Sequence, residues 1–275
     1  MATIRMPDTV PSPSQDCESL RKAVQGLGTD EKAIIRILGH RNASQRKKIR
    51  DTYQQLYNES LIDRLHSELS GDFRKAVILW TYDPAERDAK LANEALLQVI
   101  VEIACANSPQ HLLAVRQAYC SLFDCSLEED ILRKLLVGLV SSYRYDKEQV
   151  NMNISISEAS KLHEAIIVYV LSTRNVYQLR AMFECYQQNF GNPIDQLESL
   201  LRVVIWCIQS PEKHFAEVIR NSISGLGTDE GSLTRAIVTR AEIDTMKIRG
   251  EYYKTNLVIG DTSGDYKDFL MTLLG

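Results

Sequence analysis

Four copies of one helical pattern run along this chain, and this repetition limits its fold more than any other feature. In the first copy, a segment over residues 35–41 is followed by Ile49, Arg50 and Tyr53. Tyrosines that match Tyr53 follow at nearly equal intervals, as Tyr119, Tyr186 and Tyr252. Apolar residues recur at helical spacing, and alternating β-branched runs are scarce. The pattern therefore predicts an all-α chain of four repeats, each with several helices that pack on a neighbouring repeat.

The period places the repeats at residues 16–82, 83–146, 147–212 and 213–275, after a proline-containing tail over residues 1–15. We expect the matched tyrosines to be buried in the core with their hydroxyl groups hydrogen-bonded. The matched arginines are expected to pair with helix C-termini or with carboxylates between repeats. These arginines are Arg41, Arg174 and Arg240.

A six-residue segment, Gly-Leu-Gly-Thr-Asp-Glu, occurs twice, at residues 26–31 and 225–230. Glycine adopts positive φ without steric cost, and the Asp that follows can cap a helix N-terminus. Each copy is therefore predicted to be a loop that opens a helix, with several backbone carbonyl groups facing one point. Repeats two and three lack the segment, so the loop is an optional insert on a helical scaffold that persists without it.

Such a loop, combined with one carboxylate, fits Ca²⁺, which binds six to eight oxygen ligands. The first loop offers the carbonyl oxygens of Val24, Gly26 and Gly28, and Glu68 follows further along the repeat, where a helix is expected to end at Gly71. Aligning Ser-Gly-Asp-Tyr at 263–266 with Ser-Gly-Asp-Phe at 70–73 places Asp261 opposite Glu68. A single carboxylate leaves coordination positions for water or for a phosphate group.

Charge and composition restrict the partners. The net charge of −4 does not favour binding to nucleic acid or directly to an anionic surface, so contact with phosphate requires a bridging cation. No run of about 18 apolar residues predicts a membrane span, and residues 1–7 lack the apolar core of a secretory signal. The six cysteines show neither a CxxC pair nor metal-finger spacing, which favours a cytoplasmic protein with free, mostly buried thiols.

Together, the two glycine loops, the downstream acidic residues and the fourfold period resemble the annexins, and most closely the plant branch of that family. The segment Trp-Thr-Tyr-Asp-Pro at residues 80–84 is similar to that branch as well. The resemblance implies four annexin repeats of about five helices each in a curved disc, and reversible, calcium-dependent binding to acidic phospholipid membranes. It implies carbonyl ligands from Ile223, Gly225 and Gly227 with Asp261 in repeat four, and the set already described in repeat one. Leu27 and Leu226 would then contact the membrane, or alternatively pack against their own helices.

Five connections are shorter than the family pattern: around 96–97, around 131–132, between 166 and 168, near 195–196, and after 256. The missing residues are either absent from the protein or omitted from the sequence as written, and five short connections at once favour omission. If they are absent, the Asp261 site is affected before the Glu68 site, because Asp261 follows Gly227 more closely than Glu68 follows Gly28.

Other activities suggested for this family were compared with the sequence. His40 stands where a peroxidase-like stress function has been proposed, but it has no partner base or haem-binding motif beside it. Residues 261–264 fit a DxxG pattern, yet no phosphate-cradling GxxxxGK[ST] loop exists. Actin binding through residues 35–37 and self-association on membranes remain alternatives, and Cys105 has no evident redox partner.

A calcium-permeable channel is the main alternative from another class. Charged residues between repeats could line a path: Asp83, Glu86, Arg87, Asp88 and Arg116. Salt bridges that hold repeats together explain these charges without membrane insertion. The sequence therefore predicts a non-enzymatic membrane-binding protein.

Overall fold

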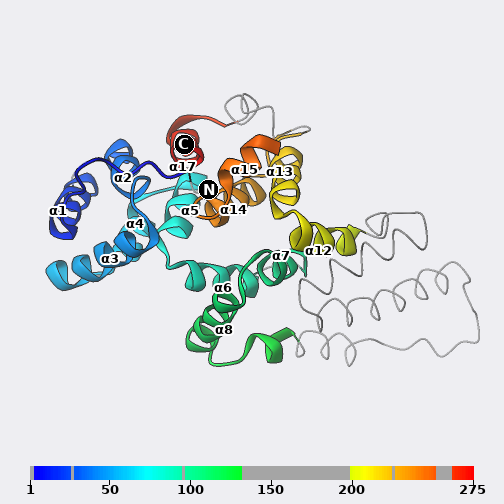
Figure 1. Ribbon diagram of the computed structural model, residues 1–275. Coiled ribbons are helices and arrows are strands. Elements are labelled where there is room, and N and C mark those ends of the chain that lie inside the picture. The colour runs from blue at the N-terminus through cyan, green and yellow to red at the C-terminus, as the bar shows by residue number, and fades with distance from the viewer. Residues whose placement is uncertain (1–2, 26–27, 95–96, 132–198, 225–226, 252–261) are drawn as a thin grey trace, which may run out of the picture. The chain divides into compact units, whose positions relative to one another are not determined.

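The computed structural model describes residues 3–25, 28–94, 97–131, 199–224, 227–251 and 262–275, and every element in these ranges is an α-helix (Figure 1). The predicted all-α class is confirmed. The chain divides into two compact bodies: Met1–Asp88 with Glu212–Gly275, and Ala89–Pro211. The first and last segments of the sequence therefore share one body, which we call the terminal body.

Five helices form from the first part of the terminal body: α1 (Pro13–Ala23), α2 (Glu31–Leu38), α3 (Ala43–Tyr57), α4 (Leu61–Glu68) and α5 (Gly71–Thr81). Short polar side chains start the first four of them. Ser12, Asp30, Asn42 and Ser60 each accept a hydrogen bond from the backbone N–H three residues further on. These caps satisfy donors that the first helical turn leaves unpaired.

The last part of the chain contributes α13 (Pro211–Ser222), α14 (Glu230–Arg240), α15 (Thr245–Glu251) and α17 (Gly264–Leu274). The second body contains α7 (Leu97–Ala106), α8 (Pro109–Phe123) and α12 (Ser199–Gln209), and α7 packs against α12. Helix α6 (Pro84–Glu94) begins in the terminal body, directly after the sequence Trp-Thr-Tyr-Asp.

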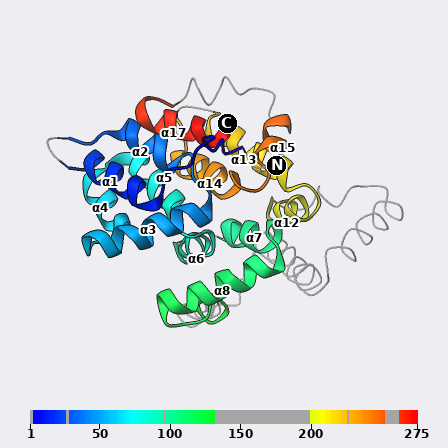
Figure 2. The ribbon, with the colours of Figure 1, turned by 60° about the vertical axis from the view of Figure 1, so that its left-hand side comes forward.

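The two halves of the terminal body pack reciprocally. Helix α5 packs against α14, while its counterpart α17 packs against α2, the counterpart of α14. Helices α5 and α17 also pack against each other, where the rings of Phe73 and Phe269 meet edge to face with centroids 6.0 Å apart. Figures 1 and 2 both show α5, α14 and α17 side by side. Such an exchange of equivalent partners is what an approximate twofold relation between two copies produces.

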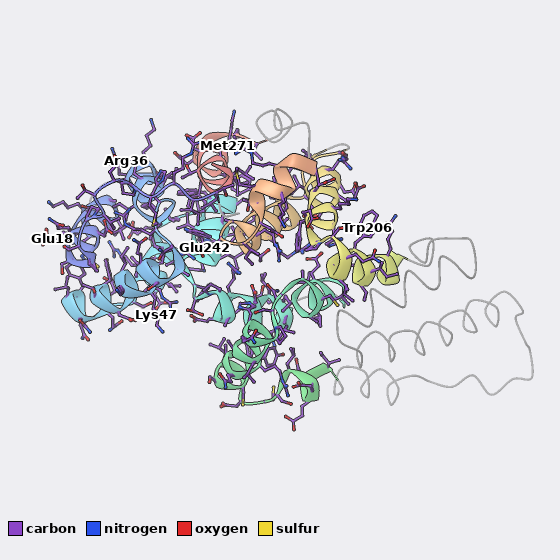
Figure 3. All side chains as sticks on the ribbon, viewed as in Figure 1. Glu18, Arg36, Lys47, Trp206, Glu242 and Met271 are labelled. Carbon is purple, nitrogen blue, oxygen red and sulfur yellow. The ribbon has the colours of Figure 1, made fainter. Side chains whose placement is uncertain are left out.

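A buried polar cluster joins these halves. The Arg46 guanidinium lies 3.5 Å from the centroid of the Trp80 ring and forms an ion pair of 2.9 Å with Glu242. Glu242, labelled in Figure 3, also accepts a hydrogen bond of 2.6 Å from the backbone N–H of Ala43. Trp80 is fully buried and donates through Nε1 to the Leu38 carbonyl. Burial lowers the pKa of Arg46 to about 10, so the arginine stays charged at neutral pH.

Two of the matched arginines, Arg41 and Arg240, pair with carboxylates of their own repeat. Arg41 makes two hydrogen bonds, of 2.7 and 2.8 Å, to the carboxylate of Asp16, and all of these groups are buried. Arg240 pairs in the same way with Asp244. These carboxylate partners lie in the arginine's own repeat rather than in another one, and the alternative of a helix C-terminus is met by Arg41, which also donates to the His40 carbonyl just after α2. Arg174 lies outside the described residues.

Two of the four matched tyrosines lie in described segments, and the prediction for them is confirmed. Tyr53 and Tyr119 are fully buried. The hydroxyl of Tyr53 accepts from Arg21 at 3.1 Å, and that of Tyr119 donates to Asp130 at 2.6 Å. Tyr186 and Tyr252 lie outside the described residues.

The N-terminal segment from residue 3 to residue 12 contains no helix. Thr3 is buried; its N–H donates to the Ala241 carbonyl and its hydroxyl to the Leu273 carbonyl, which brings the two ends of the chain together in Figure 1. Helix α1 begins at Pro13, slightly before the start drawn for the first repeat at residue 16.

Candidate metal centre

The first glycine loop connects α1 to α2, as predicted. Its end is closed by a hydrogen bond of 2.9 Å from the backbone N–H of Asp30 to the Ala23 carbonyl. Gly28 has a φ of 91°, which is the left-handed region that favours glycine. The Asp30 carboxylate caps α2 by accepting from the N–H of Ala33 at 2.9 Å. Hydrogen bonds therefore hold the loop both where it leaves α1 and where it enters α2.

The second glycine loop repeats this backbone between α13 and α14. The N–H of Asp229 donates to the Ser222 carbonyl at 2.7 Å, and Gly227 has a φ of 98°. Asp229 caps α14 by accepting from the N–H of Ser232, and this bond lowers the pKa of the Asp229 carboxyl below its ordinary value. The two loops thus share one geometry where both are described.

The predicted carboxylate lies at the end of α4, since Glu68 is the last residue of that helix. Gly71 does not end this helix, as the sequence suggested, but begins α5. The hydroxyl of Thr29, which follows the first loop, donates to the Glu68 carbonyl at 3.4 Å. This contact holds the loop beside the carboxylate.

One nitrogen atom joins the loop to the carboxylate. Nη2 of Arg64 donates to the Val24 carbonyl at 2.8 Å and lies 3.1 Å from Oε1 of Glu68. The two oxygens can therefore be no farther apart than the sum of these two distances. That upper limit is somewhat larger than the separation of about 5 Å between two oxygens on opposite sides of a calcium ion. The structure thus brings two of the predicted ligands close to one point, and a positive charge already lies there.

Sequence reasoning did not single out Arg64. A signal was present, because Arg64 precedes Glu68 by four residues and the two therefore lie on one face of α4. The contact of Arg64 with the Val24 carbonyl could not be read in this way, since the two residues are 40 positions apart.

This donor set suits a hard cation bound mainly by carbonyl oxygens. Val24 is buried at 1% exposure, so its carbonyl belongs to a packed part of the loop. Within the described ranges, no group of three or more His, Cys, Asp or Glu side chains is arranged to hold a metal ion. These residues can therefore contribute to a metal site made of backbone carbonyls and one carboxylate.

The fourth repeat carries the same framework up to the limit of its described residues. Ser263, before α17, has φ −140° and ψ 163°, and Ser70, before α5, has φ −137° and ψ 165°. Ile223 is buried, as Val24 is. Five of the predicted site residues lie outside the described residues: Gly26, Leu27, Gly225, Leu226 and Asp261.

Replacing Gly28 by alanine is expected to destabilise the loop. A Cβ at Gly28 would meet no atom within 4 Å, so the cost comes from the backbone alone, about 1–2 kcal/mol. Urea unfolding of Gly28→Ala measures this cost, and Gly28→Asn is the control, because asparagine tolerates positive φ better. Equal stability of Gly28→Ala and the unmodified protein would contradict the described conformation.

The residues named for the alternative activities are buried or make contacts within the protein. Nδ1 of His40 hydrogen-bonds the Arg5 carbonyl at 2.6 Å, which ties it to the N-terminal segment. Ile35 and Ile37 are buried, so they are not available to a protein partner. Glu86 pairs with Arg50 at 2.9 Å.

Of the other charges named for a channel, Arg87, Asp88 and Arg116 form ion pairs, and the Asp83 carboxylate accepts a hydrogen bond of 3.1 Å from the backbone N–H of Ala85. Arg87 pairs with Asp88, both are buried, and Arg87 also donates to the Val238 carbonyl. Arg116 pairs with Glu128 on the surface. The pair of Arg50 with Glu86 joins repeats one and two, as expected for salt bridges between repeats, whereas the pairs of Arg87 and Arg116 lie within repeat two. No helix in the described ranges combines the length and the apolar character that crossing a bilayer requires.

Comparison with known proteins gives a consistent result. The annexin family profile matches residues 15–80 and 214–273. The chain is 55% identical to Annexin D3 of Arabidopsis thaliana, over 100% of this chain and 99% of the relative. It is 46% identical to Annexin Gh1 of Gossypium hirsutum with the same coverage. The alignment with Annexin D3 spans 318 residues and so exceeds the 275 residues of this chain, in agreement with the short connections noted above.

Solved structures show the same relationship. Annexin III superimposes with a TM-score of 0.83 at 29% identity, covering 100% of this chain and 97% of the other. Calcium-bound annexin (Sm)1 gives a TM-score of 0.75 at 29% identity, covering 100% and 93%. The chain therefore belongs to the annexins, a family of generally calcium-dependent phospholipid-binding proteins, and it is most similar to plant annexins.

Proposed function

We propose that this protein binds acidic phospholipid membranes reversibly through Ca²⁺ held by the first glycine loop and Glu68. The ligands would be the carbonyl oxygens of Val24, Gly26 and Gly28 and the Glu68 carboxylate. The observation that supports this assignment is the convergence of the Val24 carbonyl and the Glu68 carboxylate on one nitrogen, at 2.8 and 3.1 Å. Two oxygens that both contact one cationic nitrogen lie near enough to each other for a shared cation to be a reasonable proposal.

The charges explain why the lipid would be anionic. When bound, a calcium ion supplies positive charge and open coordination positions for lipid phosphate oxygens. Glu68 neutralises only part of that charge, because it is the one carboxylate of the proposed set. The chain itself has a net charge of −4, so its surface as a whole does not attract anionic lipid. Membrane binding would consequently depend on calcium and reverse when calcium is removed.

A second site is proposed in the fourth repeat, with carbonyl ligands from Ile223, Gly225 and Gly227 and the carboxylate of Asp261. The shared loop closure and the positive φ of Gly227 support it. Leu27 and Leu226, between the paired glycines, would contact the membrane interface. In a cell the protein would be cytoplasmic and would associate peripherally with membranes when calcium rises.

Vesicle co-sedimentation tests this function. The protein should pellet with phosphatidylserine vesicles in millimolar calcium, remain in the supernatant with a calcium chelator, and fail to pellet with phosphatidylcholine vesicles in either condition. Equal pelleting with and without calcium, or no pelleting with phosphatidylserine vesicles at millimolar calcium, would overturn the proposal.

We propose further that the protein is not an enzyme, and its thiols provide a test of one alternative. Burial, reinforced by the Asp16 carboxylate, raises the pKa of Cys17 to about 11, and burial raises the pKa of Cys105 to about 11. Less than about 0.1% of either thiol is then ionised at pH 7.5, and the thiolate is the reactive form. The thiolate fraction rises tenfold per pH unit until the pH approaches 11.

Iodoacetamide at pH 7.5 should therefore modify the exposed Cys120 well before Cys17 or Cys105 in the folded protein. Mass spectrometry of timed samples measures the order, and protein unfolded in urea, where all thiols react, is the control. Rapid labelling of Cys17 in the folded protein would reopen a thiol-based activity.

A further inference from the structure

The cation that joins the two halves of the first site is part of the chain itself. Arg64 lies within α4, and its Nη2 contacts both the Val24 carbonyl and the Glu68 carboxylate. These are two of the oxygens proposed above as calcium ligands. A guanidinium and a calcium ion cannot both occupy hydrogen-bonding or coordination distance of the same oxygens without strong charge repulsion.

The contacts of Arg64 indicate that the arginine can be displaced. Its side chain is 27% exposed, as is that of Glu68, so water can replace part of each contact. A further carboxylate, Glu59, lies at the edge of the contact range, 4.0 Å away. Nε of Arg64 is buried and makes no hydrogen bond within the described part of the chain. The guanidinium thus uses only part of its hydrogen-bonding capacity to hold the Val24 carbonyl and the Glu68 carboxylate.

We infer that Arg64 acts as an internal cation that competes with Ca²⁺ at the first site and so sets the calcium concentration at which this site fills. The inference rests on the proposed function, because it concerns the same oxygens. Without calcium, Arg64 balances the Glu68 charge and holds the α1–α2 loop against the end of α4. When calcium is present, these two contacts must break, and the lost contact energy weakens apparent calcium affinity.

The fourth repeat differs at this position. In the alignment that places Asp261 opposite Glu68, the residue opposite Arg64 is Leu257, which carries no charge. This alignment gives the fourth repeat no charged counterpart of Arg64, so the two loops, although identical in sequence, would respond to different calcium concentrations.

Thermal unfolding measured over a series of calcium concentrations, without lipid, tests the inference. Asp261→Asn in every protein isolates the first site, and calcium bound only to the folded state raises the midpoint. In this background, Arg64→Gln should lower the unfolding midpoint without calcium by about 1–4 °C. The calcium concentration at which the midpoint begins to rise should fall about three- to tenfold. Arg64→Lys, which keeps the charge but has a single nitrogen on a flexible stem, should give intermediate values and retain the fold.

Arg50→Gln is the matched control. Arg50 forms an ion pair of 2.9 Å with Glu86, with side-chain exposures of 18% and 27%, so this variant removes one positive charge and a comparable contact. It should lower the midpoint without calcium but leave unchanged the calcium concentration at which the midpoint begins to rise. If Arg64→Gln requires as much calcium as the parent, or more, the inference is wrong and Arg64 instead supports the loop.

Failure of the proposed function has a different signature. Glu68→Gln in the same background should move the calcium-dependent shift to calcium concentrations on the order of 10 to 100 times higher. If the shift keeps its original calcium dependence, the ligand assignment itself fails, whatever the Arg64 variants show. If Glu68→Gln displaces the shift while Arg64→Gln leaves its calcium dependence unaltered, the proposed site stands and only the competition is overturned.

Discussion

Glu68→Gln is expected to raise the calcium concentration required for binding to phosphatidylserine vesicles by a factor on the order of 10 to 100, in a protein that also carries Asp261→Asn. Calcium affinity depends strongly on the number of charged ligands, and Glu68 is the one carboxylate of the proposed first site. Glutamine keeps the shape of the side chain and one carbonyl oxygen but removes the negative charge. It also removes the ion pair with Arg64, which lies 3.1 Å from Glu68.

Calcium titrations of vesicle co-sedimentation give the required concentration. Glu18→Gln is the control, because Glu18 is exposed on α1, where Figure 3 labels it, and carries the same charge. An effect of Glu68→Gln no larger than that of Glu18→Gln would show that net charge, rather than ligation, governs membrane binding. The ligand assignment would then be wrong.

Asp16→Ala is expected to lower the free energy of unfolding of the terminal body by about 3–5 kcal/mol, the largest effect on stability among the variants considered. Asp16 and Arg41 are each 3% exposed, and two hydrogen bonds of 2.7 and 2.8 Å join them. Removing the carboxylate leaves a buried guanidinium with only part of its hydrogen bonds, among them one to the His40 carbonyl. Urea unfolding, followed by the midpoint and the slope of the transition, measures the loss.

Two further variants separate the buried pair from ion pairs in general. Glu128→Ala breaks the pair with Arg116, whose side chains are 58% and 55% exposed, and should cost no more than about 1 kcal/mol. Asp16→Leu combined with Arg41→Met should recover much of the stability lost in Asp16→Ala, because no buried charge remains. A loss in the double variant equal to that of Asp16→Ala would contradict this explanation.

Much of the scaffold can be predicted from sequence because its signals are local or periodic. The spacing of Tyr53 and Tyr119 reports a repeat, and both side chains are buried as that spacing predicts. Asp30 and Asp229 follow the glycine loops and cap the next helices, since the cap lies three residues from its donor. The positive φ of Gly28 follows from the same local sequence.

Other features were mistaken or missed because their partners lie far apart in sequence or compete with one another. Arg41 was expected to pair with a helix C-terminus or with a carboxylate between repeats, but its carboxylate partner is Asp16 on α1, 25 positions away in the same repeat. Glu242 joins the two halves of the terminal body through Arg46, a contact between residues 196 positions apart. The repeat period does not identify such a pair, because many acidic residues of the chain are spaced in the same way relative to the repeats.

The glycine loop shows which features the sequence specifies and which depend on the tertiary structure. Sequence alone determined the all-α repeats, the loop, its helix cap and the acidic residue downstream, because each depends on residue type and spacing. Only the tertiary structure decided that Arg64 would contact both the Val24 carbonyl and the Glu68 carboxylate. Spacing along α4 predicts the second contact but not the first, since the first exists only when α4 packs beside the end of α1. The physical reason is that a charged side chain bonds oxygen atoms that lie within its reach. Folding alone determines which oxygens those are.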